Sequence, residues 1–449
     1  MHADRQLSVV SQTFSIPQRM PPTETLGFRF WNFQRAQTTQ IRSGYNNQVT
    51  SSASAAGHVA SDSLSHAPAA RRALAGLGLS GLLAGLLGAI LPAWGYHLNF
   101  DFETVGHYFL SVTAGVLLSV WIGRRLFRSH GVAFVLILSS ALACAALLFL
   151  AFSAPPLPAI WRMGGLLMVG LSIGLLNTAI FQAISTIYRQ DPAATLNLGG
   201  IVFGLGCVVI TLLVAGTFNA YSVTVILILV AIAPALFALL YAKTSFPAPA
   251  IPDPPPFSAV VRDFRSRGAV LLALLLFFQF GNEWSIAGWL TIFLIHQLGV
   301  SPEASLELLA LYWLALLLGR IAAIVILRRV AHGRVLVASS GAALFGCTIL
   351  LSTNNQFGAA TGILLVGAGF ATIYPLVAEK IGHRFTDYHP GLFNGIFSIA
   401  MIGAMLAPWL LGYAANTWGI GVVMAAPLAG TFMVFILTLL IWLESKLVG

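Results

Sequence analysis

Apolar segments of helix length recur along most of this chain, with short polar loops between them. They lie at residues 73–97, 104–122, 132–153, 160–187, 195–217, 221–242, 268–298, 303–327, 335–352, 357–379, 391–415 and 419–443. Each is close to the roughly 20 residues that cross a bilayer as a helix, and a spanning segment must satisfy its own backbone hydrogen bonds. Only 8% of the residues are charged, whereas soluble domains have about a quarter. The sequence therefore predicts an all-α membrane protein with twelve transmembrane helices.

Lys and Arg are concentrated in alternate loops, as the positive-inside rule requires. The basic residues of one side are Arg71, Arg72, Arg124, Arg125, Arg128, Arg189, Lys243, Arg262, Arg265, Arg267, Arg328, Arg329, Arg334, Lys380, Arg384 and Lys446. The loops of the other side, among them HLNFDFE and HQLGVSPEAS, are nearly free of Lys and Arg. We expect both termini to be cytoplasmic, in a plasma (inner) membrane. The net charge of +9 is explained by these loops, so no nucleic-acid partner is predicted.

Polar and Pro-rich stretches divide the chain into four parts. Residues 1–68 are rich in Ser, Thr, Gln and Asn and predict a disordered tail. A transit peptide, or a start codon assigned too far upstream, would also explain this stretch. A six-helix bundle is expected over 69–243 and another over 268–449, joined by a linker at 244–267 that contains SFPAPAIPDPPPF.

The two predicted bundles resemble each other in sequence. A shift of about 197 residues places GGLLMVGLSIGLLNT, from Gly164, over TGILLVGAGFATIYP, from Thr361. The same shift aligns Asn197 with Asn394 and Gly206 with Gly403. Agreement of several segments at one offset indicates duplicated, pseudo-symmetric halves.

Two parallel six-helix halves joined by a loop are the architecture of the major facilitator superfamily, and a loop motif supports the resemblance. Gly123–Arg125, between the second and third predicted spans, resembles the end of that superfamily's signature, and Gly319–Arg320 resembles its counterpart. The signature is degenerate, because Val120 stands where its acidic residue is expected. The residues that the resemblance implies for conformational gating are Arg124, Arg125 and Arg320. A purely topological role for these arginines is the alternative.

A narrower resemblance is to the sugar transporters related to the fucose:proton symporter. It rests on Gly281–Asn282–Glu283, Trp313, Tyr374–Pro375, GIFSIAMIGAMLAPWLLG in span eleven, TAI-F-Q after Asn177, and Leu196–Gly200. The proton-coupled members carry acids in spans one and four, where this chain has Gly88 and Asn177. Since an amide does not exchange a proton at physiological pH, either Glu283 takes the proton or transport is uncoupled.

Glu283 lies near the middle of the apolar stretch Gly268–Gly299, with Gln279 one helical turn before it. Ionisable residues at such depth are costly, and they usually mark a solute or proton path. Asn282 flanks the same face, and these amide and carboxylate groups could bind sugar hydroxyls. Interhelical hydrogen bonding is the alternative for both amides and, paired or protonated, for Glu283. Arg320 could pair with Glu283 in one conformation and release it in another.

Four further residues are candidates for binding a solute. Trp289 could stack on a sugar ring, although tryptophan also collects at membrane interfaces. Asn177 and Tyr374 lie in helices that border the cavity in the resembled fold, and they align in the repeat. Asn197 is a polar candidate at the start of span five, or the cap of that helix.

The sequence thus predicts a secondary transporter of a small solute, with a monosaccharide as the expected substrate, that works by alternating access as a monomer in the bilayer. Efflux of an amphipathic compound is the alternative within transport. A membrane-embedded enzyme is disfavoured, since His383, Asp387 and His389 form the only cluster suited to metal or acid–base chemistry. No phosphate-binding loop, cofactor or metal site is predicted.

Overall fold

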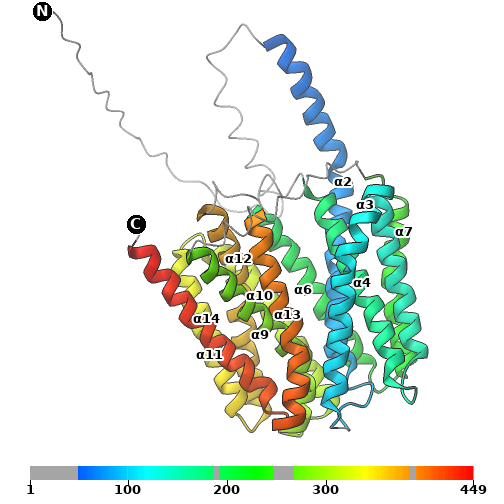
Figure 1. Ribbon diagram of the computed structural model, residues 1–449, viewed down its shortest axis with the longest axis vertical. Helices are drawn as coiled ribbons and strands as arrows, with labels where there is room; N and C mark the ends of the chain where they lie inside the picture. The colour runs from blue at the N-terminus through cyan, green and yellow to red at the C-terminus, as the bar shows by residue number, and fades with distance from the viewer. Residues whose placement is uncertain (1–48, 99, 186–191, 247–266, 385–390, 448–449) are drawn as a thin grey trace, which may run out of the picture. The chain divides into compact units, whose positions relative to one another are not determined.

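The computed structural model describes residues 49–98, 100–185, 192–246, 267–384 and 391–447. Within these ranges the regular structure is helical (Figure 1). The chain divides into two compact units, Met1–Ser65 and His66–Gly449. The first contributes, among its described residues, the beginning of a helix that starts at Val49, inside the range for which the sequence predicts disorder. The second unit contains all the membrane-spanning segments.

In the described part of the chain, five helices precede the central linker. They are α2 (Val49–Ile90), α3 (Phe102–Phe152), α4 (Ala159–Ala183), α6 (Pro192–Thr217) and α7 (Val223–Ala242). The apolar part of α2 that could cross a membrane begins at Pro68. The predicted linker falls almost entirely on residues 247–266, which lie outside the described part of the chain.

The helix α3 contains two membrane spans. As one straight helix its 51 residues would be roughly 75 Å long, more than twice the thickness of a bilayer core. Gly131 breaks it, with φ 78° and ψ −179°, a backbone conformation that glycine adopts without strain. The two ends meet at Arg162 of α4, whose Nε donates to the Tyr108 hydroxyl (2.6 Å) and whose Nη1 donates to the Ser153 carbonyl (3.3 Å). Thus α3 folds back at Gly131 into an antiparallel pair.

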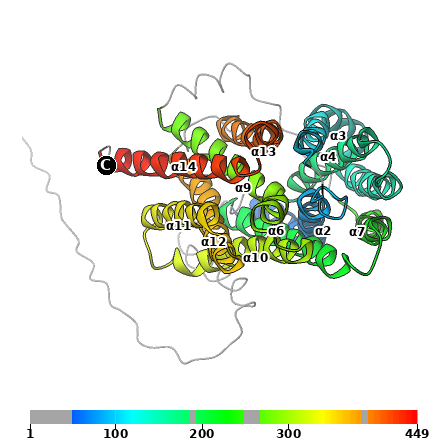
Figure 2. The ribbon, with the colours of Figure 1, turned by 90° about the horizontal axis from the view of Figure 1, so that it is seen from below.

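Six helices follow the linker among the residues that the structure describes. They are α9 (Arg267–Leu298), α10 (Pro302–Ile326), α11 (His332–Ser352), α12 (Gln356–Arg384), α13 (Gly391–Trp418) and α14 (Val422–Leu447). Eleven helices of the described chain are long and apolar enough to cross a membrane, and with α3 counted as two they give the twelve predicted spans. Seen along the helices, α9–α14 form one group beside the helices of the first half (Figure 2).

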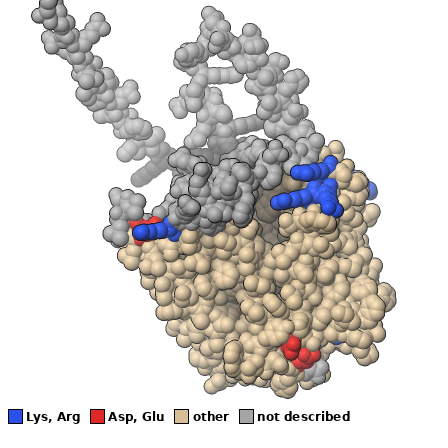
Figure 3. Space-filling view, in the orientation of Figure 1, with Lys and Arg blue, Asp and Glu red and all other residues tan. Residues whose placement is uncertain are grey.

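Lys and Arg side chains gather at one end of the helices. Figure 3 shows most of the visible Lys and Arg there, with an acidic patch beside them, and further acidic side chains at the opposite end. We call the first the basic end; it carries Arg124, Arg125 and Arg128, beside the turn at Gly131. This arrangement agrees with the predicted alternation of the loops.

The two halves contact each other closely at the end opposite the basic end, where α3 begins and α13 ends. Tyr413 of α13 shares a hydrogen bond with the His107 ring (2.8 Å). Gly106 and Gly412 let the two backbones meet, because a Cβ atom at Gly412 would lie 2.6 Å from the Gly106 Cα. Small residues at helix crossings allow this approach in membrane proteins.

A second contact between the halves joins α2 and α9. The hydroxyl of Thr291 donates to the Gly88 carbonyl (3.0 Å). A Cβ atom at Gly88 would collide with the carbonyl oxygen of Ala287. An acidic side chain at this position, as in the resembled proton-coupled transporters, would therefore not fit the present conformation.

Candidate functional site

Glu283 lies midway along α9 and is 5% exposed. Its Oε1 is 3.8 Å from Nη2 of Arg320 on α10. At this distance in a poorly polarisable interior each charge strongly stabilises the other, and the loss of one would leave the other buried and unpaired. The structure therefore brings together the two intramembrane charges whose pairing in one conformation the sequence suggested.

Arg320 also connects the two halves of the protein. Its Nη1 donates to the Gly200 carbonyl of α6 (2.7 Å), while Nη2 faces Glu283. A Cβ atom at position 200 would lie 2.5 Å from Nη1, so a larger residue there would displace the guanidinium from its present position. One planar guanidinium thus links the backbone of the first half to a carboxylate of the second.

Several buried polar atoms around this pair have no hydrogen-bond partner among the described residues. They are Oε2 of Glu283, both amide atoms of Gln279, Nε of Arg320 and Nε1 of Trp313. Buried polar groups in proteins are nearly always satisfied by protein or water. This set combines donors with acceptors, which is what a hydroxylated solute needs from its site.

Aromatic rings flank the charged pair on the side facing the first half. Trp284 follows Glu283 directly, is partly exposed and contacts Phe203 of α6 and Trp313 of α10, each at 6.2 Å between ring centroids. The hydroxyl of Tyr312 donates to the backbone carbonyl of Glu283 (3.3 Å) and ties α10 to α9. Trp284 and Tyr312 are not among the residues predicted from the sequence, although they stand next to Glu283 and Trp313 along the chain.

Two residues predicted to bind the solute, Trp289 and Asn282, take part in helix packing. Trp289 is fully buried (0% exposed), its Nε1 donates to the Pro408 carbonyl (2.9 Å), and its ring packs on Phe102 and Phe109. A ring so enclosed offers no face to a sugar in this conformation. Asn282 donates to the Thr431 hydroxyl of α14 (3.3 Å), which favours the alternative of interhelical hydrogen bonding.

The remaining candidates for binding a solute are Asn177, Asn197 and Tyr374. Oδ1 of Asn177 and Oδ1 of Asn197 are buried without a partner in the described chain. Asn197 lies one helical turn before Gly200, which holds Arg320. Tyr374 packs with Phe280 and Phe397, at 5.2 and 6.1 Å between ring centroids.

Arg124 and Arg125, which the resemblance predicts to act in gating, are exposed at the basic end, away from Glu283, and Arg125 lies over the Trp121 ring (4.0 Å). Their role in conformational gating stays a prediction. Asp387 and His389 of the alternative enzymatic cluster lie outside the described residues.

Arg162, on α4 at the end opposite the basic end, is a buried cation that is not among the residues predicted from the sequence. Besides the ends of α3, it binds the Leu157 carbonyl (2.8 Å) and lies 5.8 Å from the centre of the Trp94 ring. Its position inside an apolar run was the available signal. Its contacts are all within the first half, so we regard it as an anchor of the α3 hairpin.

Comparison with known proteins extends these observations. The family model of the Major Facilitator Superfamily matches residues 73–408. An uncharacterized transporter of this type from Yersinia pestis is 22% identical over 76% of this chain and 86% of its own length. A glucose/galactose transporter of Brucella abortus is 24% identical over 72% of this chain and 80% of its own. The glucose/mannose transporter GlcP of Bacillus subtilis is 23% identical over 59% and 69%.

Solved structures show the same fold. The fucose:proton symporter FucP of E. coli superposes with a TM-score of 0.56 at 16% identity, covering 84% of this chain and 99% of its own. The nucleoside transporter NupG superposes with a TM-score of 0.62 at 14% identity, covering 83% and 99%. The predicted twelve-helix architecture is therefore confirmed.

Proposed function

Because this chain belongs to the major facilitator superfamily, we propose that it carries a monosaccharide across the membrane by alternating access, with Glu283 binding and releasing the coupling proton. It is a multi-pass membrane transporter and not an enzyme. Sugar transport is supported by the names of the relatives, glucose/galactose and glucose/mannose transporters. The basic loops support a location in the plasma (inner) membrane with both termini in the cytoplasm.

The observation that carries the proposal is that Arg320 contacts both the Glu283 carboxylate and the Gly200 carbonyl. In this conformation Arg320 neutralises the carboxylate and binds the opposite half at once. Protonation of Glu283 would remove the attraction between the two side chains and free Arg320 to follow the first half. A proton and a change in the contact between the halves are thereby coupled through one side chain.

The sugar itself would lie beside this pair. Gln279 and Oε2 of Glu283 supply unpaired acceptors, and Gln279 and Trp313 supply unpaired donors. Trp284, rather than the enclosed Trp289, presents an accessible ring next to them. An apolar ring face with polar groups at its edge matches the amphipathic shape of a pyranose.

Replacing Glu283 with glutamine tests the proton coupling. In proteoliposomes of the full-length protein, wild-type accumulation of labelled hexose should rise as the outside pH falls below the inside pH. Glu283→Gln, which keeps the shape but not the exchangeable proton, should lose accumulation and retain sugar counterflow. Glu307→Gln, on the exposed face of α10, is the matched control and should behave as wild type.

The outcomes separate the parts of the proposal. Accumulation by Glu283→Gln in a pH gradient, equal to wild type, would remove Glu283 from coupling. Wild-type counterflow without any pH-driven accumulation would indicate uncoupled facilitation. No counterflow of glucose, galactose, mannose or fucose by wild type would refute the sugar as substrate.

The Trp284 side chain allows a test of sugar binding that is independent of the proton. Trp284→Ala should raise the half-saturating sugar concentration about fivefold, and Trp284→Phe much less, since an aromatic contact contributes about 1 kcal/mol. Half-saturation is measured by counterflow. Trp161→Ala, at an exposed position on α4, is the control. An unchanged half-saturation in Trp284→Ala would place the sugar elsewhere.

A further inference from the structure

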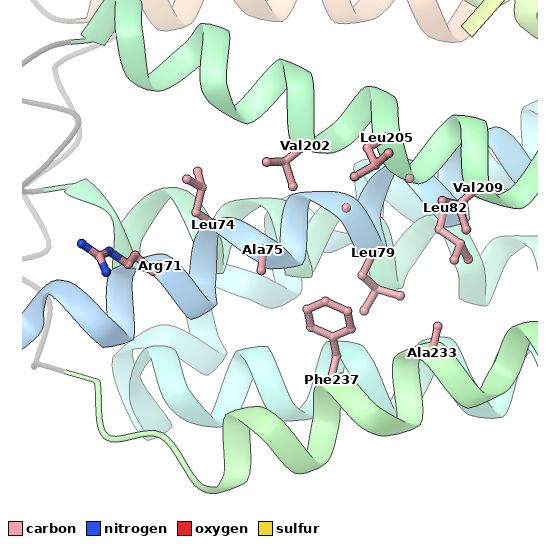
Figure 4. Close-up of a pocket in the computed structure, with 12 residues that line it drawn as sticks. Arg71, Leu74, Ala75, Leu79, Leu82, Val202, Leu205, Val209, Ala233 and Phe237 are labelled. Atoms are coloured by element: carbon pink, nitrogen blue, oxygen red, sulfur yellow. The ribbon is translucent and has the colours of Figure 1, made fainter. Parts of the chain in front are cut away.

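An apolar groove of about 430 Å³ lies between α2, α6 and α7, in the first half and away from the Glu283 site. Figure 4 shows Leu79 and Leu82 of α2, Leu205 and Val209 of α6, and Phe237 of α7 around it. All its lining residues are apolar except Arg71. In the same view Arg71 stands at one end of the row.

The length of the groove corresponds to one leaflet of a bilayer. From Arg71 to Leu82 along α2 the helix rises roughly 16 Å. Half of a typical hydrocarbon core is about 15 Å. With Arg71 at the basic end, the groove therefore runs from the membrane interface to the midplane.

The groove opens sideways. Leu205 and Val209 on its wall are 53% and 45% exposed, and such exposed leucine and valine on a membrane helix face lipid. Its floor is formed where α2 and α6 meet backbone to backbone, at Gly78 and Gly206. The helix α7 packs on α3 and scarcely touches α6, so a channel stays between α6 and α7.

We propose that this groove binds one acyl chain of an anionic phospholipid from the leaflet at the basic end, with the lipid phosphate beside Arg71. The apolar walls accept any acyl chain equally, because lipid tails are as apolar as leucine. Selectivity must therefore come from the charge at the mouth, where the positive charge of Arg71 favours an anionic head group. The occupant would contact all three helices at once.

The test uses photo-crosslinking in nanodiscs with the full-length protein. The probe is phosphatidylglycerol with a diazirine on one acyl chain, and labelled peptides are mapped by mass spectrometry. Labelling should concentrate on the peptides of α6 and α7 that contain Leu205 and Phe237. A phosphatidylcholine probe of the same chain length should label them about fivefold less, which corresponds to one head-group charge.

Two variants probe the two ends of the groove. Arg71→Gln should reduce labelling by phosphatidylglycerol about fivefold, to the level of the phosphatidylcholine probe. Leu205→Trp should block the groove and reduce labelling by both probes. The controls are Arg128→Gln, which removes another exposed charge at the basic end, and Leu236→Trp, at an exposed position of α7 outside the groove. Neither should change the labelling.

Labelling spread evenly over the lipid-facing helices would overturn the proposal, because that is the pattern of bulk lipid. Equal labelling by the two probes, or an unchanged pattern in Arg71→Gln, would overturn the role of the arginine and with it the anionic lipid. Crosslinks from these peptides to a second copy of the chain in place of lipid would also refute it.

Discussion

Arg320→Ala is expected to abolish uptake and to destabilise the folded protein by about 3–5 kcal/mol, the usual cost of removing one partner from a buried ion pair. The variant leaves the Glu283 carboxylate without its cation and the Gly200 carbonyl without its donor. A destabilisation of about 3 kcal/mol in the conformation that holds this pair changes its population about a hundredfold. Thermal unfolding in detergent and sugar counterflow in proteoliposomes measure the two effects.

Two companion variants separate charge from geometry. Arg320→Lys keeps the charge, but an ammonium group lacks the planar fork that reaches Glu283 and Gly200 together, so it should restore stability more than transport. The double variant Glu283→Gln with Arg320→Gln removes both charges and should be more stable than Arg320→Ala alone. Arg334→Ala, exposed on α11, is the control. If Arg320→Ala has the melting temperature and the sugar counterflow of wild type, the ion pair of Arg320 and Glu283 contributes to neither stability nor transport.

The spans could be predicted because a bilayer imposes one length and one kind of backbone pairing on them. The two spans in α3 illustrate this. The sequence predicts a loop between them at the arginines near Gly131, and in the structure the helical segment α3 reverses direction at that glycine. The presence of Glu283 in a buried position also followed from sequence, since charge at such depth must face protein.

The partners of the buried polar residues could not be predicted in the same way. Helical periodicity indicates which face of α9 is buried but not which neighbour each side chain meets. Asn282 and Glu283 are adjacent in sequence, yet one contacts α14 and the other α10. Trp289 could equally have faced a cavity, and its bond to Pro408 depends on a residue more than a hundred positions away.

The missing acid in span one shows the same limit. The resemblance to proton-coupled sugar transporters indicates only that Gly88 lacks a proton-binding group. In the structure it is the point at which α2 touches the backbone of α9. Glycine at position 88 is therefore a packing requirement of this conformation.

Gly412→Val is expected to prevent the halves from meeting at the end opposite the basic end and to lower uptake at least about tenfold. A Cβ atom at this position would lie 2.6 Å from the Gly106 Cα and 2.7 Å from the Phe102 carbonyl oxygen. Both are backbone atoms, which cannot turn aside as a side chain could. Because alternating access requires each end to close in turn, a protein that cannot close this end would bind solute there without releasing it on the other side.

The expected conformational change can be measured apart from transport. Spin labels on Asp101→Cys and Thr417→Cys, exposed near the adjoining ends of α3 and α13, should report a longer distance in Gly412→Val than in wild type. Gly216→Val is the matched control, since a Cβ atom there would meet no atom within 4 Å. A Gly412→Val protein that keeps both the wild-type distance and the wild-type uptake would show that the contact between α3 and α13 is not part of the transport cycle. If instead uptake falls while equilibrium sugar binding persists, the close approach at Gly106 and Gly412 is the gate of this end, and glycine is required there because only a backbone without side chains can close it.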